Sequence, residues 1–253
     1  MSVHLPETKA YKGWGMEGPV ARWYAGMTRN SMAEFTKLAT RVASQIPAKA
    51  SVLEVAPGPG YFAIELAKLG DYSITGLDIS KTFVGIARHN AIAASVAVDF
   101  QQGNASRMPF VDESFDFLLC RAAFKNFSEP QRALQEMYRV LKPGGSALII
   151  DLRRDASMDS IRHAACGMNA GPVNRFITKL TFRYMLLKRA YTKCEFQQMI
   201  ADTKFHQVQM NENPIGLEIV LSKPGTDFLN WAYFTLHGAE TNQGSTNNTA
   251  TKH

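Results

Sequence analysis

An apolar segment that runs into a glycine-containing turn is the strongest chemical signal in the sequence. The segment is Val52-Leu53-Glu54-Val55-Ala56-Pro57-Gly58-Pro59-Gly60, and a helical pattern follows it. Glycines at 58 and 60 allow positive φ and let the backbone approach a ligand closely, while the first amides of the following helix point at a negatively charged group. The pattern predicts a strand, a turn and a helix that hold a nucleotide-like ligand.

A carboxylate at the end of the next apolar segment fits the same kind of ligand. Asp78 lies in Thr75-Gly76-Leu77-Asp78-Ile79, about 20 residues after the glycines, as expected for a side chain that binds both hydroxyls of a ribose. Dinucleotide folds and S-adenosylmethionine (SAM) folds share this geometry. The third glycine of G-x-G-x-x-G is missing here, because residues 61–63 are Tyr, Phe and Ala. A pyrophosphate needs that small residue for close packing, so the turn favours SAM over NAD.

The elements that must position these residues alternate along the chain. Apolar runs predict strands at 51–55, 73–77, 96–101, 115–120 and 146–151, and helical periodicity predicts helices at 61–69 and 81–94. A further helix is predicted with Ser128 as its cap and Leu134, Tyr138 and Leu141 on one face. Such alternation predicts a parallel sheet with helices on both faces.

The two ends of the sequence complete this picture. After an irregular start, Ser31 and Glu34 have the spacing of a capping box and predict a helix to about Ile46. A helix at 193–203 and two alternating segments, 208–212 and 217–221, predict a hairpin that closes the sheet. The expected fold is α/β: a Rossmann-like, mainly parallel seven-stranded sheet with an antiparallel last strand and a helical lid insertion.

This organisation predicts a division of the chain into five parts. The expected parts are an N-terminal helical cap (1–50), a SAM-binding core (51–152), a helical lid (153–191), a completion of the core (192–222) and an extension (223–253) that is disordered from about 238.

Composition and charge exclude several classes of protein. With 45% hydrophobic and 20% charged residues, the chain is typical of a globular protein. It lacks a signal-peptide pattern and an apolar stretch long enough for a membrane span, so we expect a cytoplasmic protein. Its three cysteines have no metal-ligand spacing, and no metal site is expected. Nine Lys and Arg against two Asp make residues 153–193 basic, which is a local feature and does not predict nucleic-acid binding.

Further motifs follow in a characteristic order. They are Gly103-Asn104-Ala105, Met108-Pro109-Phe110, Phe115-Asp116 and Leu141-Lys142-Pro143-Gly144-Gly145. With the glycine turn and Asp78, this series resembles the class I SAM-dependent methyltransferases, specifically the small-molecule group of the methyltransferase type 11 kind. The resemblance extends from Ser51 to Asp151 and, more loosely, from Tyr191 to Ser222.

The resemblance implies a set of cofactor contacts. Glu54, Ala56, Gly58 and Gly60 would surround the methionine part, Asp78 would hold the ribose, Ile79 would pack on the adenine, and Asn104 and Ala105 would meet its edge. The sequence departs from the family at Ala56, where a glycine is usual, and at Asn104, where an aspartate is usual. Alanine still offers a backbone amide, and an Asn oxygen can accept from the adenine amino group.

The acceptor pocket has fewer candidates. Ligands of parallel sheets bind at the carboxyl ends of strands, so Arg121 is expected to reach the cofactor carboxylate and Lys125 either orients an acidic substrate or faces solvent. Tyr24 belongs to an aromatic-rich N-terminal segment, with Tyr11, Trp14 and Trp23, that either folds over the site or packs on the sheet edge. No general base is assigned.

A basic amphipathic helix is predicted near the end of the lid. Its apolar face includes Val173, Leu180 and Tyr191, the last a further pocket candidate, and Arg175, Lys179 and Arg183 share another face. Two interpretations stay open for this helix: a lid over the substrate pocket, or docking on an anionic membrane, which would suit a lipid-like acceptor such as a quinone precursor.

The sequence therefore predicts a SAM-dependent methyltransferase that acts on an apolar or acidic small molecule by in-line displacement. The segment after the fourth strand, Cys120-Arg121-Ala122-Ala123, lacks the Asn/Asp-Pro-Pro-aromatic motif of adenine and amide methylation. Two alternatives remain: a SAM-binding protein or non-methylating enzyme on the same fold, and a nicotinamide-dependent reductase, which the glycine turn disfavours.

Overall fold

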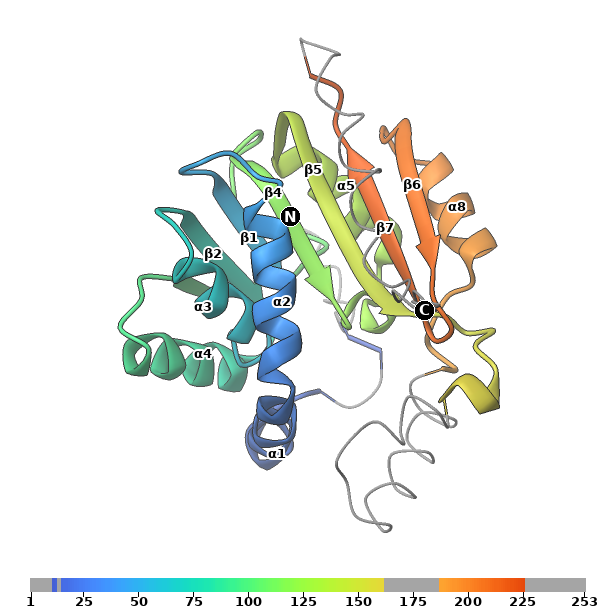
Figure 1. Ribbon diagram of the computed structural model, residues 1–253. Coiled ribbons are helices and arrows are strands. Elements are labelled where there is room, and N and C mark those ends of the chain that lie inside the picture. Colours follow the sequence, from blue (N-terminus) through green and yellow to red (C-terminus); the bar gives the residue numbers. More distant parts are fainter. Residues whose placement is uncertain (1–10, 13–14, 162–186, 226–253) are drawn as a thin grey trace, which may run out of the picture.

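A seven-stranded sheet with the strand order β3-β2-β1-β4-β5-β7-β6 forms the centre of the molecule (Figure 1). The computed structural model describes residues 11–12, 15–161 and 187–225. The strands are β1 (Ser51–Val55), β2 (Ser73–Asp78), β3 (Asp99–Gln102), β4 (Phe115–Arg121), β5 (Leu141–Leu152), β6 (Gln207–Glu212) and β7 (Gly216–Ser222). The helices in the described residues include α1 (Gly18–Thr28), α2 (Met32–Ala43), α3 (Tyr61–Ala67), α4 (Lys81–Ala93), α5 (Pro130–Val140) and α8 (Lys193–Ala201), with 3-10 turns η1 (Arg29–Ser31) and η2 (Phe124–Asn126).

The strand directions confirm the predicted fold class. The neighbours β3, β2, β1, β4 and β5 pair in parallel, whereas β7 pairs antiparallel with both β5 and β6. The last strand therefore enters between two strands that run the other way, and the hairpin places β6 at the edge of the sheet.

Both faces of the sheet are covered by helices, because the strands are apolar on both sides. In β1, Val52 packs with the cluster that includes Phe35 of α2 and Phe62 of α3, whereas its neighbour Leu53 packs with the cluster that includes Leu134 of α5. Alternate residues of one strand thus supply two cores. Figure 1 shows α2, α3 and α4 on one side of the sheet and α5 and α8 on the other.

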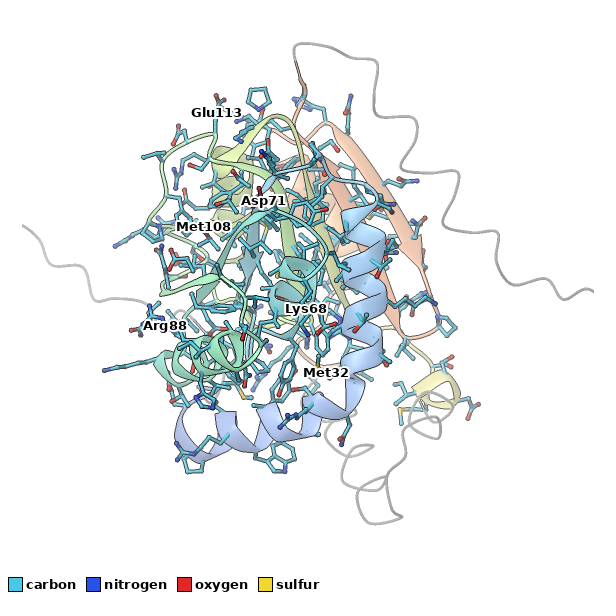
Figure 2. All side chains as sticks on the ribbon, turned by 60° about the vertical axis from the view of Figure 1, so that its left-hand side comes forward. Met32, Lys68, Asp71, Arg88, Met108 and Glu113 are labelled. Atoms are coloured by element: carbon cyan, nitrogen blue, oxygen red, sulfur yellow. The ribbon has the colours of Figure 1, made fainter. Side chains whose placement is uncertain are left out.

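The carboxyl ends of the parallel strands meet at one edge of the sheet, where α1 also lies (Figure 1). Figure 2 shows Asp71 and Glu113, which precede β2 and β4, toward the opposite edge, and Met32 at the start of α2 near α1. Residues that follow β1, β2, β4 and β5 are consequently neighbours in space although they are far apart in the sequence.

The N-terminal region differs from the expectation of an irregular start, because residues 18–28 form α1. Its buried face consists of Ala21 and Ala25, four residues apart, so the helix has no large apolar stripe for a periodicity argument to detect. The predicted capping box of α2 is also wrong. Ser31 makes no capping hydrogen bond, and the Glu34 carboxylate instead accepts from Arg121.

Several element boundaries also differ. The N-cap of α5 is Glu129 and not Ser128, and the Glu129 side chain makes no capping hydrogen bond. The hydroxyl of Ser128 is buried and has no partner among the described residues. Leu141 belongs to β5, which is longer than predicted, and β3 begins later than predicted, at Asp99. The helix before β6 does begin at Lys193, where Thr192 and Glu195 form a capping box that the sequence reasoning did not identify.

Most of the predicted lid lies outside the described residues, as do the residues after 225. The basic amphipathic face, from Val173 to Arg183, falls in the undescribed range 162–186. In the part of the chain that is described, no helix is both long and apolar enough to cross a bilayer.

Two glycines provide a matched test of the packing. A Cβ at Gly76 in β2 would stand 2.5 Å from Cδ1 of the Phe100 ring, whereas a Cβ at Gly85 in α4 would meet nothing within 4 Å. We expect Gly76→Ala to lower the free energy of unfolding by about 1–3 kcal/mol through overpacking. Gly85→Ala should raise it by about 0.5–1 kcal/mol, because alanine favours a helix interior. Urea denaturation followed by circular dichroism measures both, and equal effects would contradict the packing described.

Candidate functional site

The turn between β1 and α3 has the backbone that its glycines predict. Gly58 and Gly60 have φ of 57° and 79°. A Cβ on Gly60 would lie 2.6 Å from Cζ of Phe100 and 2.9 Å from Cβ of Ala87, so only glycine fits there. A Cβ on Gly58 would meet nothing within 4 Å. The space beside Gly58 is open to a ligand, while Gly60 holds α3 close to α4.

Ala56 adopts the same left-handed region, with φ of 56°, although it has a side chain. Its amide donates to the carbonyl of Leu77 at 2.8 Å, which ties the end of β1 to β2. The left-handed conformation costs a non-glycine residue roughly 1–2 kcal/mol. Ala56 therefore has the backbone conformation that a glycine would adopt without strain. The turn keeps its shape although an alanine stands where the family usually has a glycine.

The Asp78 carboxylate joins two loops at the carboxyl edge. Its Oδ2 accepts from the amide of Gly58 at 2.9 Å and its Oδ1 accepts from the amide of Ser80 at 2.8 Å. The side chain is buried, and burial raises the pKa of Asp78 to about 6. Each carboxylate oxygen has a further lone pair. Asp78 can therefore accept two more hydrogen bonds, as the two hydroxyls of a ribose would require.

Glu54 is buried in β1 and points into the start of α3. Its Oε2 accepts from the amide of Ala63 at 3.1 Å, one of the free amides of the first helical turn. Burial raises the pKa of Glu54 to about 8, so the side chain is mostly protonated at neutral pH. In this structure, Glu54 caps a helix as well as standing beside the glycine turn.

The residues predicted to meet the adenine surround the end of β2. Ile79 is 40% exposed, which is unusual for a large apolar side chain that directly follows a buried strand. The side-chain oxygen of Asn104 accepts from the amide of Ser106 at 2.9 Å, and one lone pair of that oxygen remains. Ala105 packs against the core. The amide of Gly103 donates to the carbonyl of Asp78 at 2.9 Å. This hydrogen bond brings Asn104 and Ala105 close to Asp78, the residue predicted to bind the ribose.

Arg121, at the end of β4, contacts α2. Its Nη2 donates to Oε2 of Glu34 at 3.1 Å, and its guanidinium lies 4.5 Å from the centre of the Phe35 ring. These contacts orient Arg121 and attach the carboxyl end of β4 to the N-terminal region.

A buried ion pair occupies the carboxyl ends of β4 and β5. Nζ of Lys125 lies 2.8 Å from Oδ1 of Asp151 and donates to the carbonyl of Ala122 at 2.6 Å. Asp151 also accepts from the amides of Lys125 and Leu152 at 2.9 and 2.7 Å. Lys125 is 3% exposed, so the alternative that it faces solvent is wrong. Buried charges persist where partners offset their desolvation, as they do here.

Sequence reasoning missed Asp151 as a site residue. The available signal was the same as at Asp78: an acidic side chain that ends a buried strand of a parallel sheet. It was assigned only as the end of a strand, because its lysine partner is far away in the sequence.

Two described pieces of the N-terminal region flank the glycine turn. The amide of Lys12 donates to the carbonyl of Asn126, after β4, at 2.7 Å. The hydroxyl of Ser80, after β2, donates to the carbonyl of Met16 at 2.6 Å, and Glu17 accepts from the amides of Lys81 and Thr82 at the start of α4. Since β1 lies between β2 and β4, these contacts bracket the turn that follows β1.

The aromatic candidates are also at this edge. The Tyr24 ring packs edge-on against Phe83 with centroids 5.9 Å apart, and Tyr191 accepts a hydrogen bond from Lys12. Tyr11 pairs with Phe127 in an isolated bridge. The structure thus brings Tyr24, Lys125 and Tyr191 to one edge of the sheet, together with the predicted cofactor residues.

The residues present fit the cofactor that the sequence predicts. The backbone at Gly58 is open, the buried Asp78 carboxylate has unused acceptor capacity, and Ile79 exposes an apolar surface next to it. Within the described ranges, no three His, Cys, Asp or Glu side chains form a group that could hold a metal ion.

The buried Glu54 predicts a pH dependence of stability. Because its pKa rises from an ordinary 4.5 to about 8 on folding, the folded protein binds more protons than the unfolded chain between these values, and its contribution is lost as pH rises toward 8. Asp78, with a pKa of about 6, titrates mainly at lower pH and is present in both the variant and the wild type, so it does not account for a difference between them. Glu54→Gln should therefore show a smaller fall in the free energy of unfolding between pH 6.5 and 8 than the wild type. Equal slopes in urea denaturation series would contradict the burial of an ionisable group there.

Residues 53–149 match the family model described as a methyltransferase domain. A demethylmenaquinone methyltransferase of Deinococcus radiodurans is 39% identical over 107 residues, which are 42% of this chain and 44% of that protein. Another, from Chlorobaculum tepidum, is 33% identical over 156 residues, 60% of this chain and 62% of that protein. The matched part is thus less than two thirds of either relative.

Solved structures share the fold over more of the chain. A protein assigned as a SAM-dependent methyltransferase from Methanococcus maripaludis has a TM-score of 0.68 at 20% identity and covers 88% of this chain and all of its own. The [4+2]-cyclase SpnF has a TM-score of 0.51 at 21% identity, over 75% of this chain and 81% of its own. Residues 53–149 are thus similar to the methyltransferase-domain family, and the sheet order is that of the Rossmann-like fold of SAM-dependent methyltransferases.

Proposed function

We propose that this protein is a SAM-dependent methyltransferase that methylates a small molecule of the quinone type. The observation that carries the proposal is the Asp78 carboxylate, buried at the end of β2, hydrogen-bonded to the amide of Gly58 and adjacent to the exposed Ile79. The substrate class is suggested by two relatives named demethylmenaquinone methyltransferases.

Each predicted cofactor residue receives a role in this proposal. Gly58 and Gly60 shape the turn beside the methionine part, with Ala56 and Glu54 behind it, and Asp78 binds the ribose. The adenine lies against Ile79 and next to Asn104 and Ala105. Arg121 keeps its proposed role near the cofactor carboxylate, and its ion pair with Glu34 would orient it.

When bound, SAM supplies an activated methyl group on a sulfonium, so the protein's task is alignment of the acceptor and exclusion of water. The N-terminal region suits the second task, because Lys12 and Met16 are hydrogen-bonded to the loops after β4 and β2. The loop after β4 suits the first task. The Lys125–Asp151 ion pair holds this loop against the end of β5. Ala122, in the same loop, has a left-handed backbone with φ of 57°.

A second candidate function is an enzyme that binds SAM without transferring its methyl group. The specific observation in its favour is the similarity in fold to the [4+2]-cyclase SpnF. Fold alone does not decide between the two functions, and consumption of SAM separates them.

We also propose the division into a cap (1–50), a core (51–152 and 192–222), a lid (153–191) and an extension (223–253), in a cytoplasmic protein. Contact of the lid with an anionic membrane belongs to the same proposal. It is supported by the excess of basic residues at 153–193.

Asp78 provides the sharpest test of the cofactor assignment. Asp78→Asn should weaken binding of S-adenosylhomocysteine, the demethylated cofactor, by roughly 1–3 kcal/mol, because charge-assisted hydrogen bonds to the ribose are lost. In the wild type, affinity should fall between pH 7 and pH 5, since the carboxyl is protonated as the pH drops through its pKa of about 6. Glu54, with a pKa of about 8, is mostly protonated throughout this window.

Isothermal titration calorimetry at pH 7 and pH 5 makes these measurements. Unchanged affinity in Asp78→Asn, with its circular dichroism spectrum intact, would remove Asp78 from the cofactor site. A pH effect that persists in the variant would show that another group titrates.

Turnover tests the reaction itself. We expect the purified protein to bind SAM and S-adenosylhomocysteine but not NADH, and to add the mass of one methylene to a hydroxylated naphthoquinol supplied under reducing conditions. Mass spectrometry of the product detects this change. Cofactor binding without any methylated product across a pool of small molecules would favour the non-methylating alternative, and binding of NADH alone would favour a reductase.

A further inference from the structure

The helix α1 buries small side chains and exposes large apolar ones. Its two buried residues are Ala21 and Ala25. Val20, Trp23 and Met27, by contrast, are 49%, 61% and 39% exposed. A surface helix of a globular protein normally turns its large apolar side chains toward the core. Packing of the core therefore does not account for the residues on the outer face of α1.

The three exposed side chains of α1 form one stripe. They are three and four residues apart in the sequence, and these spacings place side chains on the same face of a helix. Ile92 and Val111 are more exposed, at 77% and 79%, but in α4 and in the loop before β4, which the structure describes in full, each is the only large apolar side chain of this kind. Single exposed apolar residues are ordinary, whereas a continuous group marks a contact site.

Two arginines lie beside the apolar stripe. Arg22 in α1 and Arg29, which directly follows α1 with a helical backbone, are seven residues apart and thus stand two turns apart on one side of the helix. Both are exposed, and neither has an ion pair among the described residues. Residues 18–33 contain no Asp or Glu. Glu17, just before α1, is hydrogen-bonded to the first amides of α4. The outer face of α1 is thus apolar and positively charged.

The helix is held in this orientation by hydrogen bonds at both ends. The amide of Gly18 donates to Oγ1 of Thr82 in α4 at 3.0 Å. The hydroxyl of Tyr61 in α3 donates to the carbonyl of Ala25 at 2.9 Å. The exposure of the stripe therefore belongs to a helix that is fixed to its neighbours, and not to a frayed end.

We propose that the outer face of α1 docks on an anionic lipid surface, with Trp23 among the acyl chains and Arg22 and Arg29 on the headgroup phosphates. A helix with an apolar face and adjacent basic side chains lies in the plane of a membrane interface, because lipid covers the apolar face and anionic headgroups attract the basic residues. Tryptophan is enriched at that interface. This surface is separate from the basic face of the lid.

Charge favours a lipid surface over a second copy of the chain. In a two-fold dimer through α1, the same face of both copies would meet, so the arginines of one copy would lie near those of the other. Like charges that face each other across an interface repel. An anionic surface supplies the opposite charge instead.

Docking through α1 would turn the carboxyl edge of the sheet toward the bilayer, because α1 lies at that edge (Figure 1). An apolar acceptor could then pass from the lipid to the cofactor site without crossing water. This consequence rests on the proposed function, whereas the docking itself does not.

Sedimentation with lipid vesicles tests the docking of the purified protein. The vesicles consist of phosphatidylcholine alone or of phosphatidylcholine mixed with an equal amount of phosphatidylglycerol. The variants are Trp23→Ser, which removes the largest apolar side chain of the stripe, and Arg22→Gln/Arg29→Gln, which removes both charges.

Two matched controls remove similar groups elsewhere. Ile92→Ser removes an apolar side chain that is more exposed than Trp23. Lys68→Gln/Arg132→Gln removes two positive charges whose side chains are 45% and 63% exposed. Circular dichroism and binding of S-adenosylhomocysteine confirm that each variant is folded.

We expect the wild type to bind the mixed vesicles but not those of phosphatidylcholine alone, and to bind more weakly as the ionic strength rises, because salt screens the arginines. Trp23→Ser and Arg22→Gln/Arg29→Gln should each weaken binding to the mixed vesicles about tenfold. Both controls should bind as the wild type does.

Contact of Trp23 with lipid can also be observed directly, because brominated acyl chains quench tryptophan fluorescence on contact. Trp23→Phe keeps an apolar aromatic side chain at this position. It should bind the mixed vesicles about as well as the wild type but lose most of the quenching.

Four results would overturn the inference. The first is a wild type that does not bind the mixed vesicles, and the second is an equal loss of binding in Ile92→Ser and Trp23→Ser. The third is quenching that persists in Trp23→Phe. The fourth is a loss confined to a lid variant, Arg175→Gln/Lys179→Gln/Arg183→Gln, which would place the contact in the lid alone. Failure of the proposed function looks different, because S-adenosylhomocysteine would then not bind, or no methylated product would form, in the absence of vesicles.

Discussion

The Asp78 carboxylate is the interaction on which the rest of the site depends. By accepting from Gly58 and Ser80 it fixes the glycine turn after β1 and the first turn of α4 with one buried side chain. Parallel strands end at a common edge, but they do not by themselves set the positions of the loops that follow. Asp78 links two of these loops, and the hydroxyl of Ser80 extends the link to Met16 of the N-terminal region. Removal from water at this place also raises the pKa of Asp78.

The site is built from groups that a stable core would avoid. Ala56 and Ala122, which follow β1 and β4, have left-handed backbones, while Glu54 and the Lys125–Asp151 pair are buried in the sheet. Strain and buried charge each reduce the free energy of unfolding, and they persist only where the surrounding structure determines them. Here the surrounding structure is a sheet with apolar clusters on both faces. The groups that lower the free energy of unfolding are therefore concentrated at the edge where a ligand would bind.

Most of the fold could be predicted because strand and helix periods are local properties of the sequence. The boundaries of β1 and the antiparallel direction of the last strand agreed with prediction, since apolar runs and turn residues determine them. The helix α1 was missed, because alanine forms its buried face. The capping box at Ser31 and Glu34 was predicted wrongly, because a long-range partner, Arg121, competes for the carboxylate. Lys125 could not be placed for the same reason: its partner Asp151 is its neighbour only after the strands have aligned.

Hydrogen exchange with and without S-adenosylhomocysteine tests the central claim, that the carboxyl edge around Asp78 is the cofactor site. We predict slower exchange of the backbone amides at 58–63, 79–81 and 104–106 when the ligand is present, because the ligand would shield or rigidify these loops. The groove between α8 and β6, lined by Ile200, Phe205 and Met210 at the other end of the sheet, serves as the internal reference and should not change. Protection confined to that groove, or none at the three loops at a saturating ligand concentration, would contradict the account.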